Sequence, residues 1–172
     1  MDDRIRKAWK VSLNWLSEED GCASEVFFSK VQLKHVAEVI PANLEHVKGL
    51  RGASSDGQGN FLVIEDIEQI GRALYHDNVV SIELEFTNSL KTKDIRLLTL
   101  IDKHHDSYCD LNYLWYPEKV FDRLSENERR KVFEEIMEYF MSLQEKLRVD
   151  DLYIGPEQGP SPNKGGVNWT KL

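Results

Sequence analysis

One short stretch of the chain concentrates residue types that bind metals or move protons. It supplies five possible ligands within seven residues: His104, His105, Asp106, Cys109 and Asp110. Adjacent side chains on a strand point to opposite faces, and turns favour His and Asp without any metal. The spacing also lacks the pattern of a closed tetrahedral zinc site. We therefore expect a turn between two strands here, with no metal ion and no cofactor.

An enzyme is the alternative interpretation of the same residues. A small hydrolase or metal-dependent enzyme would use His104, Asp106 and the pair Glu83 and Glu85, brought together in one pocket. The sequence contains no His-Glu-x-x-His zinc motif, no Gly-x-Ser-x-Gly nucleophile elbow and no glycine-rich loop followed by Lys and Ser or Thr. These missing motifs favour a protein without catalytic activity.

Four polar residues are expected together on one face of a predicted sheet. Glu83 and Glu85 alternate with apolar residues and must project to the other side of their strand. Asp110 and Asn112 should project from a nearby strand, and Arg96 is the possible counter-ion. An open face would be a binding platform for a basic protein, whereas a covered one would raise carboxyl pKa values for acid/base work. An open face is also compatible with an ordinary solvated surface. If the face binds a partner, these four residues are the predicted partner-binding site.

The sheet itself is predicted from alternation and turn residues. Apolar side chains recur at every second position from 80 to 86, and Asn88 and Ser89 close that strand. Ile95–Asp102 is the next predicted strand, Lys103–Ser107 a loop, and Tyr108–Tyr116 the returning strand. Short connections of this kind predict an antiparallel meander.

A long amphipathic helix follows the meander. Pro117 suits the first turn of a short helix over 118–124, and Ser125 with Glu128 predicts a capping box at the next helix start. One apolar stripe then runs through Val132, Phe133, Ile136, Met137, Phe140, Leu143 and Leu147. We expect this stripe to pack on Ile82, Leu84, Phe86 and their cross-strand neighbours.

The N-terminal third of the sequence is harder to interpret. Residues 5–16 fit a helix better than an alternating strand, whereas 26–40 is undecided between the two and should end at Pro41. Residues 51–60 contain three glycines and predict a mobile loop. An apolar run over 61–64 and a helix from 67 to about 76 follow.

Composition and charge narrow the class of protein. The 172 residues are 41% hydrophobic and 30% charged, and the formal net charge of −8 has the wrong sign for attracting nucleic acid. No apolar run approaches the roughly 20 residues that span a membrane. Cys22 and Cys109 are far apart and predict reduced thiols, which indicates the cytoplasm.

Together these patterns predict an α+β fold in a single domain over 1–155, with a flexible Gly/Pro-rich tail over 156–172. The antiparallel meander packs against the long C-terminal helix, and the N-terminal segment is helical. The predicted function is a small acidic protein-interaction module, for example a cognate inhibitor or immunity-type protein that neutralises a basic partner. The sequence predicts no oligomeric state.

Overall fold

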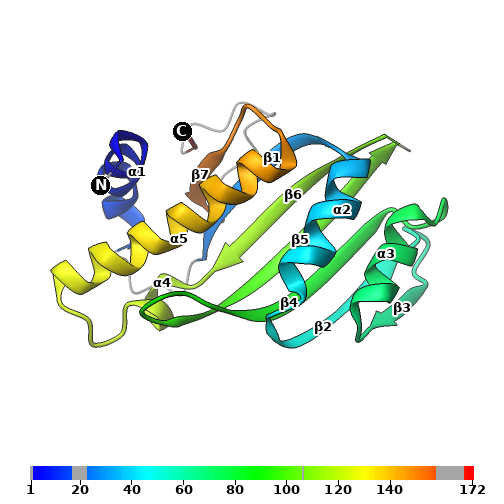
Figure 1. Cartoon of the computed structure of the whole chain (residues 1–172), viewed down its shortest axis with the longest axis horizontal. Coiled ribbons are helices and arrows are strands. Elements are labelled where there is room, and N and C mark those ends of the chain that lie inside the picture. Colours follow the sequence, from blue (N-terminus) through cyan, green and yellow to red (C-terminus); the bar gives the residue numbers. More distant parts are fainter. Residues whose placement is uncertain (1, 17–22, 106, 158–168) are drawn as a thin grey trace.

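The described part of the chain is built around one antiparallel sheet (Figure 1). The computed structural model describes residues 2–16, 23–105, 107–157 and 169–172. The strands are β1 (Ser24–Gln32), β2 (Lys48–Ser55), β3 (Phe61–Ile64), β4 (Ser81–Ser89), β5 (Asp94–His105), β6 (Tyr108–Trp115), β7 (Tyr153–Pro156) and β8 (Thr170–Lys171). They lie in the order β3-β2-β4-β5-β6-β1-β7-β8, so β3 and β8 form the edges.

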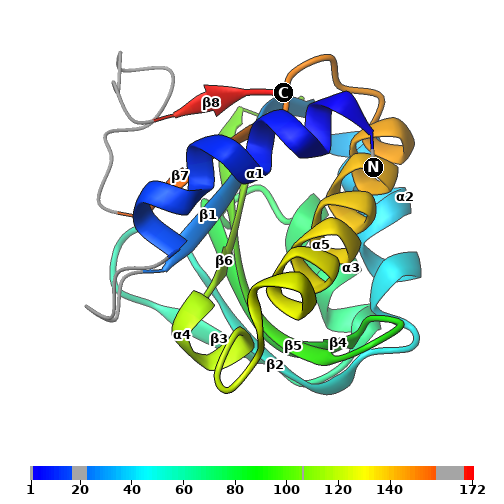
Figure 2. The ribbon, with the colours of Figure 1, turned by 90° about the vertical axis from the view of Figure 1, so that its left-hand side faces the viewer.

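The longer helices of the described chain all lie against the same face of the sheet, as Figure 2 shows. They are α1 (Asp3–Leu16), α2 (Leu33–Leu44), α3 (Ile67–Tyr75) and α5 (Glu126–Leu147), with the single-turn α4 (Pro117–Val120) before α5. The sheet curves around them, and no helix of the described residues lies on its other face. No helix in the described ranges is long and apolar enough to cross a membrane.

The predicted meander and the long helix are confirmed. β4, β5 and β6 pair consecutively and antiparallel, and Ile82, Leu84 and Phe86 are buried. The capping box predicted at Ser125 and Glu128 is present, with the Ser125 N–H donating to Glu128 Oε2 over 2.8 Å. The fold is therefore α+β, as the patterns predicted.

The long helix packs on cross-strand neighbours of the predicted residues, because Tyr113 lies in the row of Leu84 and Phe28 in the row of Ile82. Phe140 lies edge-on to Tyr113 of β6 with ring centroids 5.2 Å apart, and 6.5 Å from Phe28 of β1. Phe133 meets Trp115 of β6 at 6.5 Å. The aromatic partners of α5 thus come from β6 and from β1, the next strand in the sheet.

The undecided N-terminal region splits into three elements. Residues 3–16 form the favoured helix α1, with its buried side packed beside α5: Trp9 and Phe133 lie edge-on at 5.2 Å. Residues 24–44 form β1 followed directly by α2, and α2 continues past Pro41, where the sequence predicted an end. A proline inside a helix costs about 3 kcal/mol. Burial of Ile40 and Leu44 in the core offsets that cost.

Two predicted loops are shorter than expected. Residues 51–55 belong to β2, where Gly52 lies so close to β4 that an added Cβ would stand 2.2 Å from the Glu83 carbonyl oxygen. Only glycine fits there, so glycine in this segment marks a close strand contact and not a loop. Likewise, Lys103 pairs with Cys109 and extends β5 into the predicted 103–107 loop.

The predicted tail returns to the sheet at its end. β7 reaches Pro156, and Thr170–Lys171 forms β8 beside it, while Trp169 packs on Phe27 with ring centroids 6.1 Å apart. Residues 158–168, the greater part of that tail, lie outside the described residues.

Candidate functional site

The four predicted site residues all lie on the sheet face that carries no helix. Strand register pairs Glu83 with Leu100 and Leu100 with Asn112, which places these side chains in one row across β4, β5 and β6. Glu85 and Asp110 occupy the neighbouring rows on the same face. We call this surface the uncovered face.

Glu85 is engaged with two arginines. Its Oε2 accepts from Arg51 Nη2 of β2 at 2.7 Å, and its other oxygen pairs with Arg96 of β5, the predicted counter-ion. Partial burial opposes ionisation of Glu85, but both hydrogen bonds and both positive charges outweigh it and lower its pKa below the ordinary value. Arg51 was missed because its segment was interpreted as a loop.

Asp110 is buried and has a structural task. Its Oδ1 accepts from the Lys30 N–H at 2.8 Å, and its Oδ2 lies 2.7 Å from His104 Nε2. Lys30 has a positive φ of 55° at the irregularity where β1 shifts register against β6. The hydrogen bond that Asp110 accepts from the Lys30 backbone therefore stabilises this strained turn of β1.

The remaining two residues differ in access to solvent. The Asn112 side-chain oxygen is buried and has no hydrogen-bond partner among the described residues. Glu83 is exposed, and no ion pair engages it within the described part of the chain. Of the predicted carboxylates, Glu83 is thus the one that faces solvent without a cation beside it.

The uncovered face is also partly apolar. Leu98, Leu100 and Leu114 lie half-buried on it, in the rows of Glu85 and Glu83. Toward β7, Phe27 packs against Tyr153 with ring centroids 6.3 Å apart. The face therefore combines a few carboxylates with half-buried aliphatic and aromatic side chains.

Glu25 is the strongly perturbed carboxylate of this face. It stands on β1 between Leu114 of β6 and Gly155 of β7. Burial, and then the negative charge of Glu157, raise the pKa of Glu25 to about 7. Glu25 lies just before the undecided stretch 26–40, and no sequence pattern singled it out.

The residues of the enzyme alternative are not joined by the contacts of the described chain. His104 pairs with Asp110, and no hydrogen bond or ion pair links it to Glu83 or Glu85. Asp106 lies outside the described residues. Burial raises the pKa of the Cys109 thiol to about 12, which keeps it protonated. No group of three potential ligands that could hold a metal ion occurs among the described residues.

The edge strand β3 is the most exposed apolar segment that is described. Phe61, Leu62 and Val63 are 67%, 65% and 69% exposed, whereas Ile64 is buried. Val63 pairs with Ala53, and Ala53 pairs with Glu83, so Val63 extends the row of Glu83 to the rim of the uncovered face. The sequence showed this run as apolar but gave no sign that it lies at a sheet edge.

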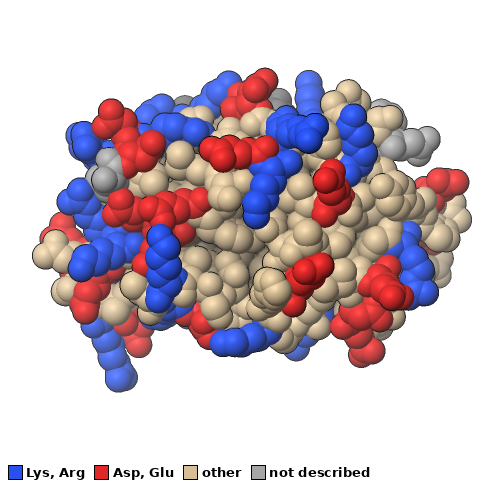
Figure 3. Space-filling model, in the orientation of Figure 1, with Lys and Arg blue, Asp and Glu red and all other residues tan. Residues whose placement is uncertain are grey.

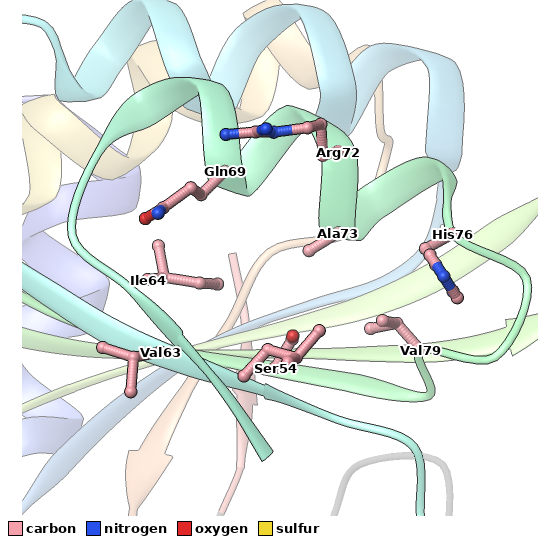
Figure 4. Close-up of a pocket in the computed structure, with 9 residues that line it drawn as sticks. Ser54, Val63, Ile64, Gln69, Arg72, Ala73, His76 and Val79 are labelled. Carbon is pink, nitrogen blue, oxygen red and sulfur yellow. The ribbon is translucent and has the colours of Figure 1, made fainter. Parts of the chain in front are cut away.

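A hollow separates β3 from α3. Its volume is about 360 Å³, and Figure 4 shows Ile64 and Ala73 turned toward one another across it, with Val63 on the far side of β3. The nine lining residues are Ser54, Leu62, Val63, Ile64, Gln69, Arg72, Ala73, His76 and Val79. Asp66 fixes the start of α3 by a capping box with Gln69 and so positions the helix over β3.

Comparisons with known proteins bear on the fold. The chain matches no protein-family model and no curated protein sequence. Its structure resembles a chain in the 1.75 Å crystal structure of the toxic C-terminal tip of CdiA from Pseudomonas aeruginosa in complex with immune protein. The TM-score is 0.53 and the identity 15%, over 80% of this chain and 87% of that chain. At this identity the likeness shows a shared fold.

Proposed function

We propose that the chain is a protein-interaction module of the immunity type, which binds and neutralises a basic protein partner. The observation that carries this function is the exposed apolar strand β3 at the rim of a sheet face that no helix covers. Contiguous apolar surface beside charged residues is typical of protein-binding sites. The likeness to a chain from a toxin and immune-protein complex supports the same class.

Charge indicates the kind of partner. The chain carries a formal net charge of −8, and Glu83 presents a solvent-facing carboxylate in the same row as Val63. A basic partner would be attracted by the summed field, and its association would weaken with salt. The site therefore combines the apolar rim at Phe61 and Val63 with Glu83. Glu85 and Asp110 stabilise the surrounding face through their contacts with Arg51, Arg96, Lys30 and His104, and Asn112 lies in the same row as Glu83.

The test uses the proteins encoded by the genes on either side of this chain's own gene. Each is expressed in a bacterial host with and without the chain, and growth and co-purification are measured. We expect one of them to inhibit growth, and the wild-type chain to bind it and restore growth. Replacing Phe61 and Val63 with Asp should abolish both effects.

Leu13→Asp is the matched control, since Leu13 is another exposed apolar residue but lies on α1, away from β3. It should bind and protect as the wild type does. If no neighbouring gene product is both toxic and bound by the chain, the immunity-type function is wrong.

A further inference from the structure

We propose that β3 accepts an extended, basic segment of the partner as an additional antiparallel or parallel strand. This inference rests on the proposed function and specifies how the partner is held. Such strand addition supplies affinity through main-chain hydrogen bonds and selectivity through alternate side chains.

The backbone of β3 has a free hydrogen-bonding side. Main-chain groups of successive residues in a strand point alternately to its two neighbours. The Ser55 carbonyl accepts from the Val80 N–H on the β4 side. The backbone N–H and C=O of Ser54 therefore point toward β3, where they bond with its register partner Leu62. By the same alternation the N–H and C=O groups of Phe61 and Val63 point outward, where the described chain offers no strand.

The side chains of β3 offer contacts on both faces of an added strand. Phe61 and Val63 lie on the uncovered face, while Leu62 lines the hollow below α3. Alternate side chains of the incoming segment would contact Phe61 and Val63 on one face. Those between them would enter the hollow beside Leu62 and Arg72.

The charges around β3 select a basic segment. From Arg51 to Arg72 the sequence has four acidic residues, Asp56, Glu65, Asp66 and Glu68, against the two terminal arginines, of which Arg51 is paired with Glu85. A second copy paired antiparallel along β3 would turn Glu65 and Asp66 of each copy toward the Asp56 end of the other, and like charges at an interface cost affinity. The occupant is therefore a basic partner segment and not another β3.

The usual protection of sheet edges is missing at β3. Natural edge strands carry Lys, Pro or bulges that prevent pairing with other chains. β3 has none of these in its four residues, Phe-Leu-Val-Ile, and pairs with β2 in unbroken register. The opposite edge, β8, is two residues long and carries Lys171.

The experiment uses two capped synthetic heptapeptides with the isotope-labelled full-length protein. One alternates Lys and Val, and its twin has Glu in place of Lys. Backbone amide exchange is measured for β3 with and without peptide. We expect the Lys peptide to slow exchange at Phe61 and Val63 by about tenfold or more, with little change at Leu62 and Ile64, which already bond to β2. The Glu peptide should bind at least about tenfold more weakly.

Two variants separate the backbone from the side chain. Val63→Pro removes the outward N–H, and it should weaken the Lys peptide about tenfold while leaving the bond pattern with β2 intact. Val63→Thr keeps the N–H and a branched side chain, and its affinity should stay within about threefold. Thermal melting of both variants checks that they fold.

Several results would overturn strand addition at β3. These are no binding of the Lys peptide at millimolar concentration, equal binding of both peptides, or binding without protection of Phe61 and Val63. Sedimentation that shows a dimer abolished by Val63→Pro would make a second copy the occupant. If Val63→Pro still neutralises the toxic neighbour, the partner adds no strand to β3, and the proposed function stands without this inference.

Discussion

The two faces of β4 differ in what surrounds them. Ile82, Leu84 and Phe86 are buried under helices, whereas Glu83 and Glu85, one position away, look out from a face with no helix. Successive residues of one strand thus serve folding on one side and surface chemistry on the other. Substitutions on the first side should change stability, and substitutions on the second should change binding.

Figure 3 shows the surface on the helix side of the molecule. Acidic and basic side chains are interspersed over much of the side that it shows, with tan surface between them. On this side the acidic side chains are therefore interspersed with basic ones and form no separate acidic patch. Local contacts decide the role of each carboxylate: Glu85 is held by arginines, Asp110 by Lys30 and His104, and Glu83 by neither.

The largest effect is expected beneath α5. Phe140→Ala removes a fully buried ring that packs against Phe28 and Tyr113, and it should lower the free energy of unfolding by about 3–5 kcal/mol through lost burial and a residual cavity. Leu100→Ala, on the uncovered face, should cost about 1 kcal/mol because its side chain is only half-buried. Urea denaturation measures both. Equal losses would erase the distinction between the faces.

Gly52→Ala tests the close approach of β2 to β4. The new Cβ would lie 2.2 Å from the Glu83 carbonyl oxygen and 2.8 Å from Leu84 Cδ2, so we expect a loss of about 1–3 kcal/mol. Gly71→Ala is the control, since its Cβ meets nothing within 4 Å and alanine favours the helix by about 0.5–1 kcal/mol. Melting curves of the two variants should shift in opposite directions.

The sequence predicted those parts of the fold whose local patterns and packing agree. Alternation from 80 to 86 and the capping box at Ser125 led to β4 and α5, because both signals are local. It missed β2 because Arg-Gly-Ala-Ser-Ser has no alternation and depends on its neighbours for pairing. The sequence did not predict that α2 continues past Pro41, because the burial of Leu44, which offsets the cost of the proline, is a tertiary effect.

The candidate site was predictable only in part. Glu83, Glu85, Asp110 and Asn112 were placed on one face by alternation, and the register agrees. Their hydrogen-bond partners come from residues far along the chain, such as Lys30, so no local pattern separates the solvent-facing carboxylate from the buried one. The exposure of β3 follows from strand order, which the sequence does not display.

Glu25 should make stability depend on pH. Its carboxyl has a pKa of about 7 in the folded chain against 4.5 when unperturbed, so the folded chain binds more protons between these values. Its contribution is complete below about pH 4.5 and is lost as the pH rises through 7. The free energy of unfolding of Glu25→Gln should equal that of the wild type near pH 4.5. At pH 8 it should be higher by about 1–2 kcal/mol, a value reduced for the partial exposure of Glu25. A difference independent of pH would contradict this.

The smallest effect on stability, and the sharpest separation of folding from binding, is expected at Glu83. Glu83→Gln keeps the size of the side chain and removes an exposed charge, so the free energy of unfolding should change by less than about 0.5 kcal/mol.

Glu85→Gln is its matched control, because it removes the same charge from a carboxylate already paired with Arg51 and Arg96. Association with a basic partner should slow in the Glu83 variant, with a weaker dependence on salt. The Glu85 variant leaves both arginines uncompensated and should slow association as well, but at a measurable cost in stability. Stopped-flow kinetics at two salt concentrations, beside urea denaturation, would distinguish the two, and an unchanged on-rate in Glu83→Gln would remove Glu83 from the site.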